Sequence, residues 1–306
     1  MTTLDCWRCG HPSLDTDAFC ESCGSPLVTA TARRAEQTTG SAAAVSDVGL
    51  RRERNEDAFA LASSAGRTTL VVCDGVASTP SAGTAASLAA RTVLATLTNE
   101  EGARVRHPAE VAQRLRDALA VAQRVVSDLA LTDPDTSPVD ADESREGAPS
   151  TTCVAAVVTG SSVQVVSLGD SRAYWLPDSG EQRLLTIDDS EAGAGLSGTS
   201  TGAGGATPLS RRLTRWIGAD DTGTPPRVHL LDVDAPGVLL LCSDGLWQYF
   251  DGPGALSELL TTAAPPDIEP LDLARRLVAA AVSAGGGDNI TAAVLPLRPS
   301  PVAVEG

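Results

Sequence analysis

The sequence predicts an α+β fold in which helices and strands form separate layers, with a small metal-bound module ahead of them. Candidate helices occur in adjacent pairs and candidate strands in clusters, an order that does not fit alternating βαβ units. Two CxxC pairs open the chain before any apolar period begins. The chain has 306 residues and 42% hydrophobic content, enough for a sizeable core, and only 3% aromatic residues, so that core is built of Ala, Val and Leu.

The N-terminal module is predicted from the pairs CWRC and CESC. They place Cys6, Cys9, Cys20 and Cys23 at the spacing of a tetrahedral zinc site. A segment of roughly 25 residues without an apolar core needs such a metal to fold. We therefore predict a zinc ribbon over residues 1–28 with one structural Zn²⁺. A disulfide knot is the alternative.

The rest of the chain divides by composition. Residues 29–44 are polar and small, without a hydrophobic period, and are predicted to be a flexible linker. Residues 45–297 contain the apolar periods of one domain, and residues 298–306 are predicted to be a disordered tail.

Within the domain, the periodicity predicts each element in turn. The strand candidates begin with DAFALASS and TTLVVCD, which two helices follow, near 82–97 and 109–130. The runs TTCVAAVV and VQVVSLGD then predict a hairpin. A strand at 238–242, helices near 255–263 and 270–284, and a strand near 290–295 complete the domain.

The charge balance narrows the possible partners. The formal net charge of −16 opposes binding to phosphate backbones, so we predict no nucleic-acid partner. No apolar run approaches the roughly 20 residues that cross a bilayer, and the N-terminus lacks the pattern of a signal peptide. We predict a cytoplasmic protein without a membrane partner.

Carboxylates stand where apolar strands end. Asp74, Asp170 and Asp244 each close such a run, and a buried charge of this kind needs water, a partner or a cation. A single Asp-Gly pair is more often a plain turn than a ligand. Several acids at strand ends favour a shared site for Mg²⁺ or Mn²⁺, which prefer oxygen ligands. Further candidates are Glu56, Asp57 and Asp288.

Seven segments of the chain resemble one known family. They are SDVGLRRERNEDAF, VVCDGVAS, STTCVAAVV, SLGDSRAYWL, LLTIDDS, LLLCSDGLWQYF and GGGDNITAAV. Their order and spacing resemble those of the metal-dependent Ser/Thr protein phosphatases of bacterial type, the PPM or type 2C family. The resemblance covers about residues 45–297. It implies a layered α-β-β-α sandwich, in which helix pairs flank two central antiparallel sheets and a two-metal centre lies at one end.

The resemblance also implies the metal ligands. In that family the residue matching Asp74 bridges two Mn²⁺ or Mg²⁺ ions, and the Gly75 carbonyl holds the second. Asp244 and Asp288 complete the first. Asp170 together with Asp244 resembles a third, weaker metal position.

Roles for the reaction follow from the same resemblance. Glu56 and Asp57 match acids that hold metal-bound water, and Arg52 matches the phosphate-binding arginine. Asn289 and Thr291 are expected to orient backbone. The implied activity is hydrolysis of phosphoserine and phosphothreonine in proteins by water that two cations activate. The expected partners are phosphorylated proteins, among them Ser/Thr kinases or their substrates, and the ribbon is a candidate docking module for another protein.

Some residues depart from the family pattern. Thr79 stands where bacterial relatives often have a histidine that could protonate the leaving group, and Asp189 stands where another histidine is common. These changes are expected to affect substrate handling and turn geometry. Thr79 also favours an alternative function, in which a catalytically weak or inactive phosphatase fold serves as a binding or scaffolding protein.

Overall fold

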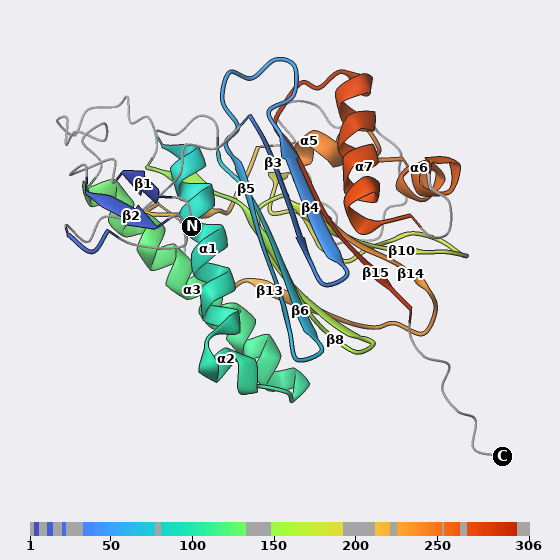
Figure 1. Cartoon of the computed structure of the whole chain (residues 1–306), viewed down its shortest axis with the longest axis horizontal. Coiled ribbons are helices and arrows are strands. Elements are labelled where there is room, and N and C mark those ends of the chain that lie inside the picture. Colours follow the sequence, from blue (N-terminus) through green and yellow to red (C-terminus); the bar gives the residue numbers. More distant parts are fainter. Residues whose placement is uncertain are drawn as a thin grey trace.

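The structure is a computed structural model that describes residues 3–5, 11–14, 20–22, 33–76, 81–132, 148–191, 212–220, 225–252, 254–263 and 268–298. Two antiparallel sheets occupy its centre (Figure 1). Together with the helices they confirm the prediction of an α+β fold with antiparallel sheets.

The larger sheet has six strands in the order β11-β10-β14-β15-β4-β3, and every neighbouring pair is antiparallel. Its strands are β3 (Arg34–Thr39), β4 (Ala42–Asp47), β10 (Arg172–Pro177), β11 (Arg183–Leu184), β14 (Gly237–Cys242) and β15 (Ile290–Leu297).

The second sheet has five strands in the order β13-β9-β8-β6-β5, again all antiparallel. They are β5 (Asp57–Ser64), β6 (Arg67–Asp74), β8 (Cys153–Thr159), β9 (Ser162–Leu168) and β13 (Arg227–Asp232). Two short ladders join β1 (Thr3–Asp5) to β2 (Pro12–Leu14) and β7 (Ser150–Thr151) to β12 (Ile217–Gly218).

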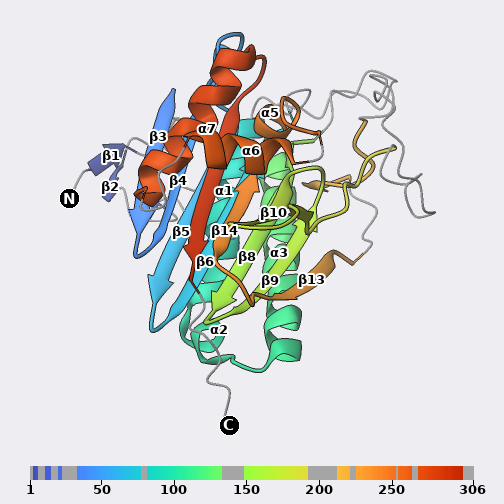
Figure 2. The same ribbon diagram turned by 90° about the vertical axis from the view of Figure 1, so that its right-hand side faces the viewer.

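Helices cover the sheets from two sides (Figures 1 and 2). On the side of the five-stranded sheet lie α1 (Ala82–Thr98), α2 (Glu100–Arg104) and α3 (Pro108–Thr132). On the side of the six-stranded sheet lie α5 (Asp244–Trp247), α6 (Ala255–Ala263) and α7 (Pro270–Ala284). Each helix group shares a hydrophobic cluster with its own sheet, and a third cluster consists almost wholly of strand residues from both sheets.

The third cluster explains the continuous apolar runs of the sequence. In β14, Leu239 and Leu241 pack between the sheets, whereas Val238, Leu240 and Cys242 pack against helices. A strand buried on both faces needs apolar side chains at every position. The run GVLLLC therefore ends where the strand leaves the core, and the next charged residue, Asp244, follows that end.

The predicted linker at residues 29–44 is wrong over its second part, because β3 and the start of β4 lie there. Gly40, with φ of 55°, permits the two-residue turn between the strands. Small side chains suit β4, since Ala42, Ala43 and Ala44 are fully packed inside the sheet layers. The folded domain therefore includes Arg34, eleven residues earlier than predicted.

Several predictions fall outside the described residues. Cys6, Cys9 and Cys23 lie there, so the zinc ribbon stays a prediction. The same holds for Thr79 and for residues 299–306 of the predicted tail. Among the helices of the described ranges, none combines the length and apolar character that crossing a membrane requires.

Candidate metal centre

Two of the predicted site acids face each other across a strand pair. Asp57 begins β5 and Asp74 ends β6, and the two are partners in the register. The Asp74 N–H donates to Thr152 Oγ1 at 3.1 Å, and the Thr152 N–H donates to the Asp74 carbonyl at 2.8 Å. Gly75 follows at a close approach, because a Cβ there would lie 2.7 Å from the Ala82 carbonyl oxygen.

The other sheet contributes Asp244 and Asp288. Asp244 begins α5 directly after β14, and Asp288 precedes β15, the neighbour of β14. A Cβ on Gly245 would overlap the carbonyl oxygen of Asn289, so glycine is needed for α5 to approach this segment. The carboxylates of Asp244 and Asp74, from the ends of the two sheets, lie close enough for each to change the pKa of the other.

Asp170 follows β9 and is held by its backbone. Trp247 Nε1 donates to the Asp170 carbonyl at 2.9 Å. The guanidinium of Arg172 lies 3.6 Å from the centre of the Trp247 ring, and two of its nitrogens donate to Asp188. Arg172, Trp247 and Asp188 were not predicted as site residues, although each lies within a segment that carries the family resemblance.

Burial and like charge dominate the electrostatics of this centre. Burial first, and then the neighbouring carboxylates, raise the pKa of Asp74 and of Asp170 well above the ordinary range. Burial followed by the charge of Asp288 raises the pKa of Asp244 to about 6. Without a cation, these acids therefore compete for protons.

Asp57 is the most enclosed of the predicted acids. Ser243 and Thr291 each donate a hydroxyl to its Oδ2 at 2.7 Å, while its Oδ1 is buried without a hydrogen-bond partner among the described residues. Burial, opposed by these two hydroxyls and assisted by the charges of Asp244 and Asp288, raises its pKa to about 7. Thr291 was expected to orient backbone, but its hydroxyl contacts a carboxylate.

Arg52 and Glu56 lie at the rim. Arg52 Nη2 donates to Asp288 Oδ2 at 2.7 Å, and both side chains are partly exposed. The Glu56 N–H donates to Asn289 Oδ1 at 2.7 Å, and Asn289 Nδ2 donates to the Arg54 and Val48 carbonyls. The predicted backbone role of Asn289 is confirmed.

The donor set fits a hard cation. It consists of carboxylates with raised pKa values and one orphaned buried oxygen on Asp57, and a divalent ion would relieve the repulsion among them. As the side chains of the described residues stand, no three acidic, thiol or imidazole groups already meet in coordinating geometry. Asp288 in particular is turned to Arg52.

Comparison with known proteins decides the family. The family model described as Protein phosphatase 2C matches residues 51–276. The chain belongs to this family. The match contains Arg52 and the predicted Mn²⁺ or Mg²⁺ ligands from Glu56 to Asp244, while Asp288 lies beyond it.

Relatives of the phosphatase 2C chain come from bacteria and plants. The serine/threonine protein phosphatase PstP of Mycobacterium tuberculosis is 30% identical over 258 residues, which are 82% of this chain and 44% of the relative. The probable protein phosphatase 2C 76 of Arabidopsis thaliana is 29% identical over 160 residues, 48% of this chain and 37% of the relative. The chain thus spans less than half the length of these curated relatives.

Solved phosphatases share the fold. The structure of serine/threonine phosphatase Stp1 from Staphylococcus aureus has a TM-score of 0.69 at 23% identity and covers 84% of this chain and 94% of its own. The Mycobacterium tuberculosis phosphatase PstP/Ppp has a TM-score of 0.63 at 25% identity, with 84% and 98% covered.

Proposed function

We propose that this phosphatase 2C chain hydrolyses phosphoserine and phosphothreonine in proteins. The observation that carries the proposal is the convergence of Asp74, Asp244 and Asp288 from two sheets at one end of a phosphatase 2C fold, beside Arg52. An acidic site of this kind repels an anionic substrate unless bound cations first neutralise the carboxylates.

Two Mn²⁺ or Mg²⁺ ions would be held by Asp74, the Gly75 carbonyl, Asp244 and Asp288, with Glu56 through water and Asp170 at a third position. When bound, such ions acidify water and neutralise the charge of a phosphoryl group. The rest of the work belongs to the chain itself. The carboxylate of Asp57, which accepts hydrogen bonds from two hydroxyls, would stay fixed in position behind the site.

Arg52 would bind the phosphate of the substrate. Its guanidinium can donate two parallel hydrogen bonds to a phosphoryl group, which a lysine cannot reproduce. At present it is paired with Asp288. If the Asp288 carboxylate turned from Arg52 to serve as a metal ligand, the arginine would have its donors available for substrate. Its position at the exposed rim suits that role.

We extend the proposal to the N-terminal module and to the setting of the protein. Cys6, Cys9, Cys20 and Cys23 would bind one Zn²⁺, and the ribbon would dock another protein. Phosphorylated proteins, Ser/Thr kinases or their substrates among them, would be the partners, in the cytoplasm. The four thiols at CxxC spacing support the zinc site. Zinc content near one per chain in freshly reduced protein is the expected result of metal analysis.

The activity is tested with the full chain and a phosphothreonine peptide. We expect phosphate release with Mn²⁺, none in excess EDTA, and loss of at least about a hundred-fold in kcat for Asp74→Asn, since one ligand of both ions is removed. The control is Asp232→Asn, which changes an exposed acid at the end of β13. Wild-type turnover in EDTA would contradict the proposal.

The scaffold function is the second candidate, favoured by Thr79 at the place of a proton-donating histidine. It predicts that wild-type protein binds Mn²⁺ and the phosphopeptide, yet releases no phosphate above the Asp74→Asn background. The same assay therefore separates the two functions.

A further inference from the structure

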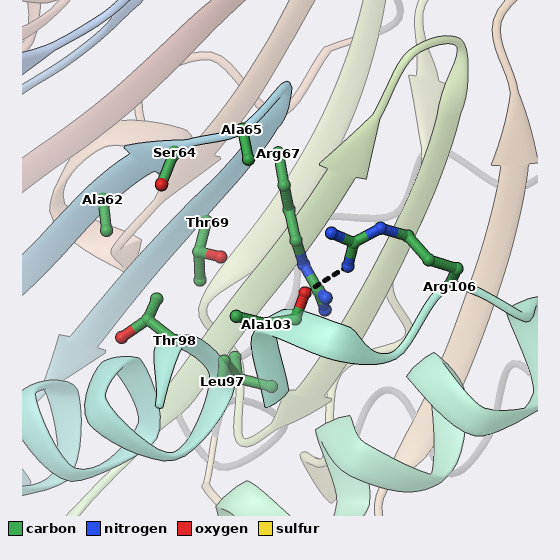
Figure 3. A pocket seen from close by; sticks show the side chains of 9 residues that line it. All are labelled: Ala62, Ser64, Ala65, Arg67, Thr69, Leu97, Thr98, Ala103 and Arg106. Atoms are coloured by element: carbon green, nitrogen blue, oxygen red, sulfur yellow. Dashed lines mark hydrogen bonds between the residues drawn. The ribbon is translucent and has the colours of Figure 1, made fainter. Parts of the chain in front are cut away.

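A small pocket lies at the hairpin end of β5 and β6, away from the candidate metal centre. It has a volume of about 110 Å³ and is lined by the hairpin, the end of α1 and the segment after α2 (Figure 3). The seven residue steps of β5 from Asp57 to Ser64 correspond to roughly 23 Å. The pocket is therefore separate from the candidate metal centre, and a ligand in it would bind whether or not the proposed phosphatase activity exists.

Arg67 forms the inner wall of the pocket and is only 7% exposed. Its Nη1 donates to the Gly102 carbonyl at 2.7 Å and to the Val105 carbonyl at 3.0 Å, which caps the end of α2. Its Nε and Nη2 are buried and have no hydrogen-bond partner among the described residues. The capping role thus accounts for one nitrogen of the guanidinium and leaves two donors unused.

A second arginine faces the same pocket. Arg106 is exposed, and its Nη1 donates to the carbonyl of Ala103 (Figure 3). The same nitrogen donates to the carbonyl of Val105. Burial, and then the positive charge of Arg106, lower the pKa of Arg67. Two like charges side by side are unfavourable unless a negative charge lies between them.

The nearby carboxylates of α2 face other arginines. Glu100 pairs with Arg104 at 3.4 Å, and Glu101 pairs with Arg114 at 3.4 Å. No described carboxylate lies in the wall of the pocket, which contains the side chains of Thr69 and Thr98 besides the two arginines. The charge of the wall is therefore positive.

We propose that this pocket binds a small oxyanion between Arg67 and Arg106. An anion would accept charge-assisted hydrogen bonds from the unused Nε–H and Nη2–H of Arg67. Its negative charge would also offset the repulsion between the two guanidinium groups. These donors are closed to solvent as the side chains stand, so binding includes an outward movement of the exposed Arg106 side chain. The volume of the pocket is well below that of pockets for drug-sized ligands, about 300 to 1,000 Å³. We therefore expect a ligand of the size of phosphate or sulfate.

Such a group has two sources, free inorganic phosphate or the phosphoryl group of a phosphorylated peptide. Isothermal titration of the full chain in EDTA, with inorganic phosphate, a phosphoserine peptide and the unphosphorylated peptide, separates them. Saturable binding of inorganic phosphate assigns the free ion. If the phosphopeptide binds but neither inorganic phosphate nor the unphosphorylated peptide does, the ligand is the phosphoryl group of a peptide. Binding of neither ligand at millimolar concentration overturns the proposal.

Variants locate the binding. We expect Arg106→Gln to weaken affinity about ten-fold or more, because the anion loses a hydrogen-bonded positive charge. Arg104→Gln, which changes an exposed arginine of α2 outside the pocket wall, should change the affinity for the anion by less than about two-fold. Arg67→Lys should weaken it as well, because an ammonium cannot replace the fork of a guanidinium.

Arg52→Gln distinguishes the pocket from the candidate metal centre. If Arg52→Gln abolishes anion binding and Arg106→Gln does not, the anion binds at the metal centre and the proposal is overturned. Because Arg106 is exposed, its variant is expected to fold, and the test does not depend on the buried Arg67.

Discussion

At the scale of single residues, one buried carboxylate organises the turn that leads to Asp170. Asp189 is 3% exposed and accepts hydrogen bonds from Arg215 at 3.2 Å and from Arg227 at 2.7 Å. Its other oxygen accepts from the Gly169 N–H at 3.1 Å. Because relatives often have histidine at this position, we expected a change of turn geometry or substrate handling. The contacts of Asp189 assign it to the turn.

Asp189→Ala is expected to lower the free energy of unfolding by about 3 to 5 kcal/mol, because it breaks a buried ion pair by removing the carboxylate from Arg215. The matched control is Asp178→Ala, which removes an exposed ion pair with Arg298 at 3.6 Å. This variant should change the free energy of unfolding by less than about 1 kcal/mol. Urea unfolding of both variants in EDTA measures the difference. If both variants lowered the free energy of unfolding by the same small amount, the ion pairs of Asp189 would not be contributing to stability.

At the scale of elements, the site is built where strands leave the core. β6 and β14 are buried on both faces, and each is followed by an Asp-Gly pair in which the glycine allows a close backbone approach. At Gly245 the approach is between the first turn of α5 and the Asn289 carbonyl. Because Gly245 follows Asp244 and Asn289 follows Asp288, we expect this contact to set the separation of the two acids.

Gly245→Ala should therefore push α5 away from the segment before β15. We expect a destabilisation of about 1 to 3 kcal/mol, as for other overpacked positions, together with weaker Mn²⁺ affinity. Gly252→Ala is the control, since a Cβ there meets only Ala255 Cβ at 3.9 Å. Calorimetric titration with Mn²⁺ and thermal unfolding compare the two. Unchanged Mn²⁺ affinity in Gly245→Ala would show that the contact does not control the ligand geometry.

At the scale of the whole molecule, both sheets contribute acids to one end, and the burial of these acids, together with their mutual repulsion, links stability to pH. The pKa values of Asp57 and Asp244 in the folded protein are about 7 and about 6, above the about 3.9 of an unfolded aspartate. Between those values the folded state binds more protons than the unfolded state. Stability from these groups is therefore present below pH of about 4 and is lost as the pH rises to about 7.

In EDTA, we expect Asp74→Asn to be more stabilising at pH 7.5 than at pH 5. Burial and the neighbouring carboxylates raise the pKa of Asp74, so the cost of folding with this acid grows as the pH rises above its unfolded pKa, and Asn carries no such cost. Asp232→Asn, at an exposed position, should show no such pH dependence. Saturating Mn²⁺ should raise the Tm of the wild type at pH 7.5 and reverse the advantage of the variant. A Tm difference between Asp74→Asn and wild type that is the same at both pH values would contradict this linkage.

Much of the architecture could be predicted from the sequence, because burial and periodicity are local properties. Apolar runs that end at Asp74 and Asp244 identified both the buried strands and the acids at their ends. The strand β3 was missed because its polar residues form an edge whose only local signal is the turn at Gly40. The sequence by itself determined which elements form and which residue types stand where those elements end.

Only the tertiary structure decided which side chains meet. Arg52 and Asp288 are 236 positions apart, and the hydroxyl of Ser243 reaches Asp57 across 186 positions, so neither contact has a local signature. The same is true of Arg67, which the sequence shows as one arginine in a hairpin and the fold encloses with two unused donors. The physical reason is that hydrogen bonds and charge repulsion depend on distance in space, which the chain acquires only when the two sheets pack and exclude water.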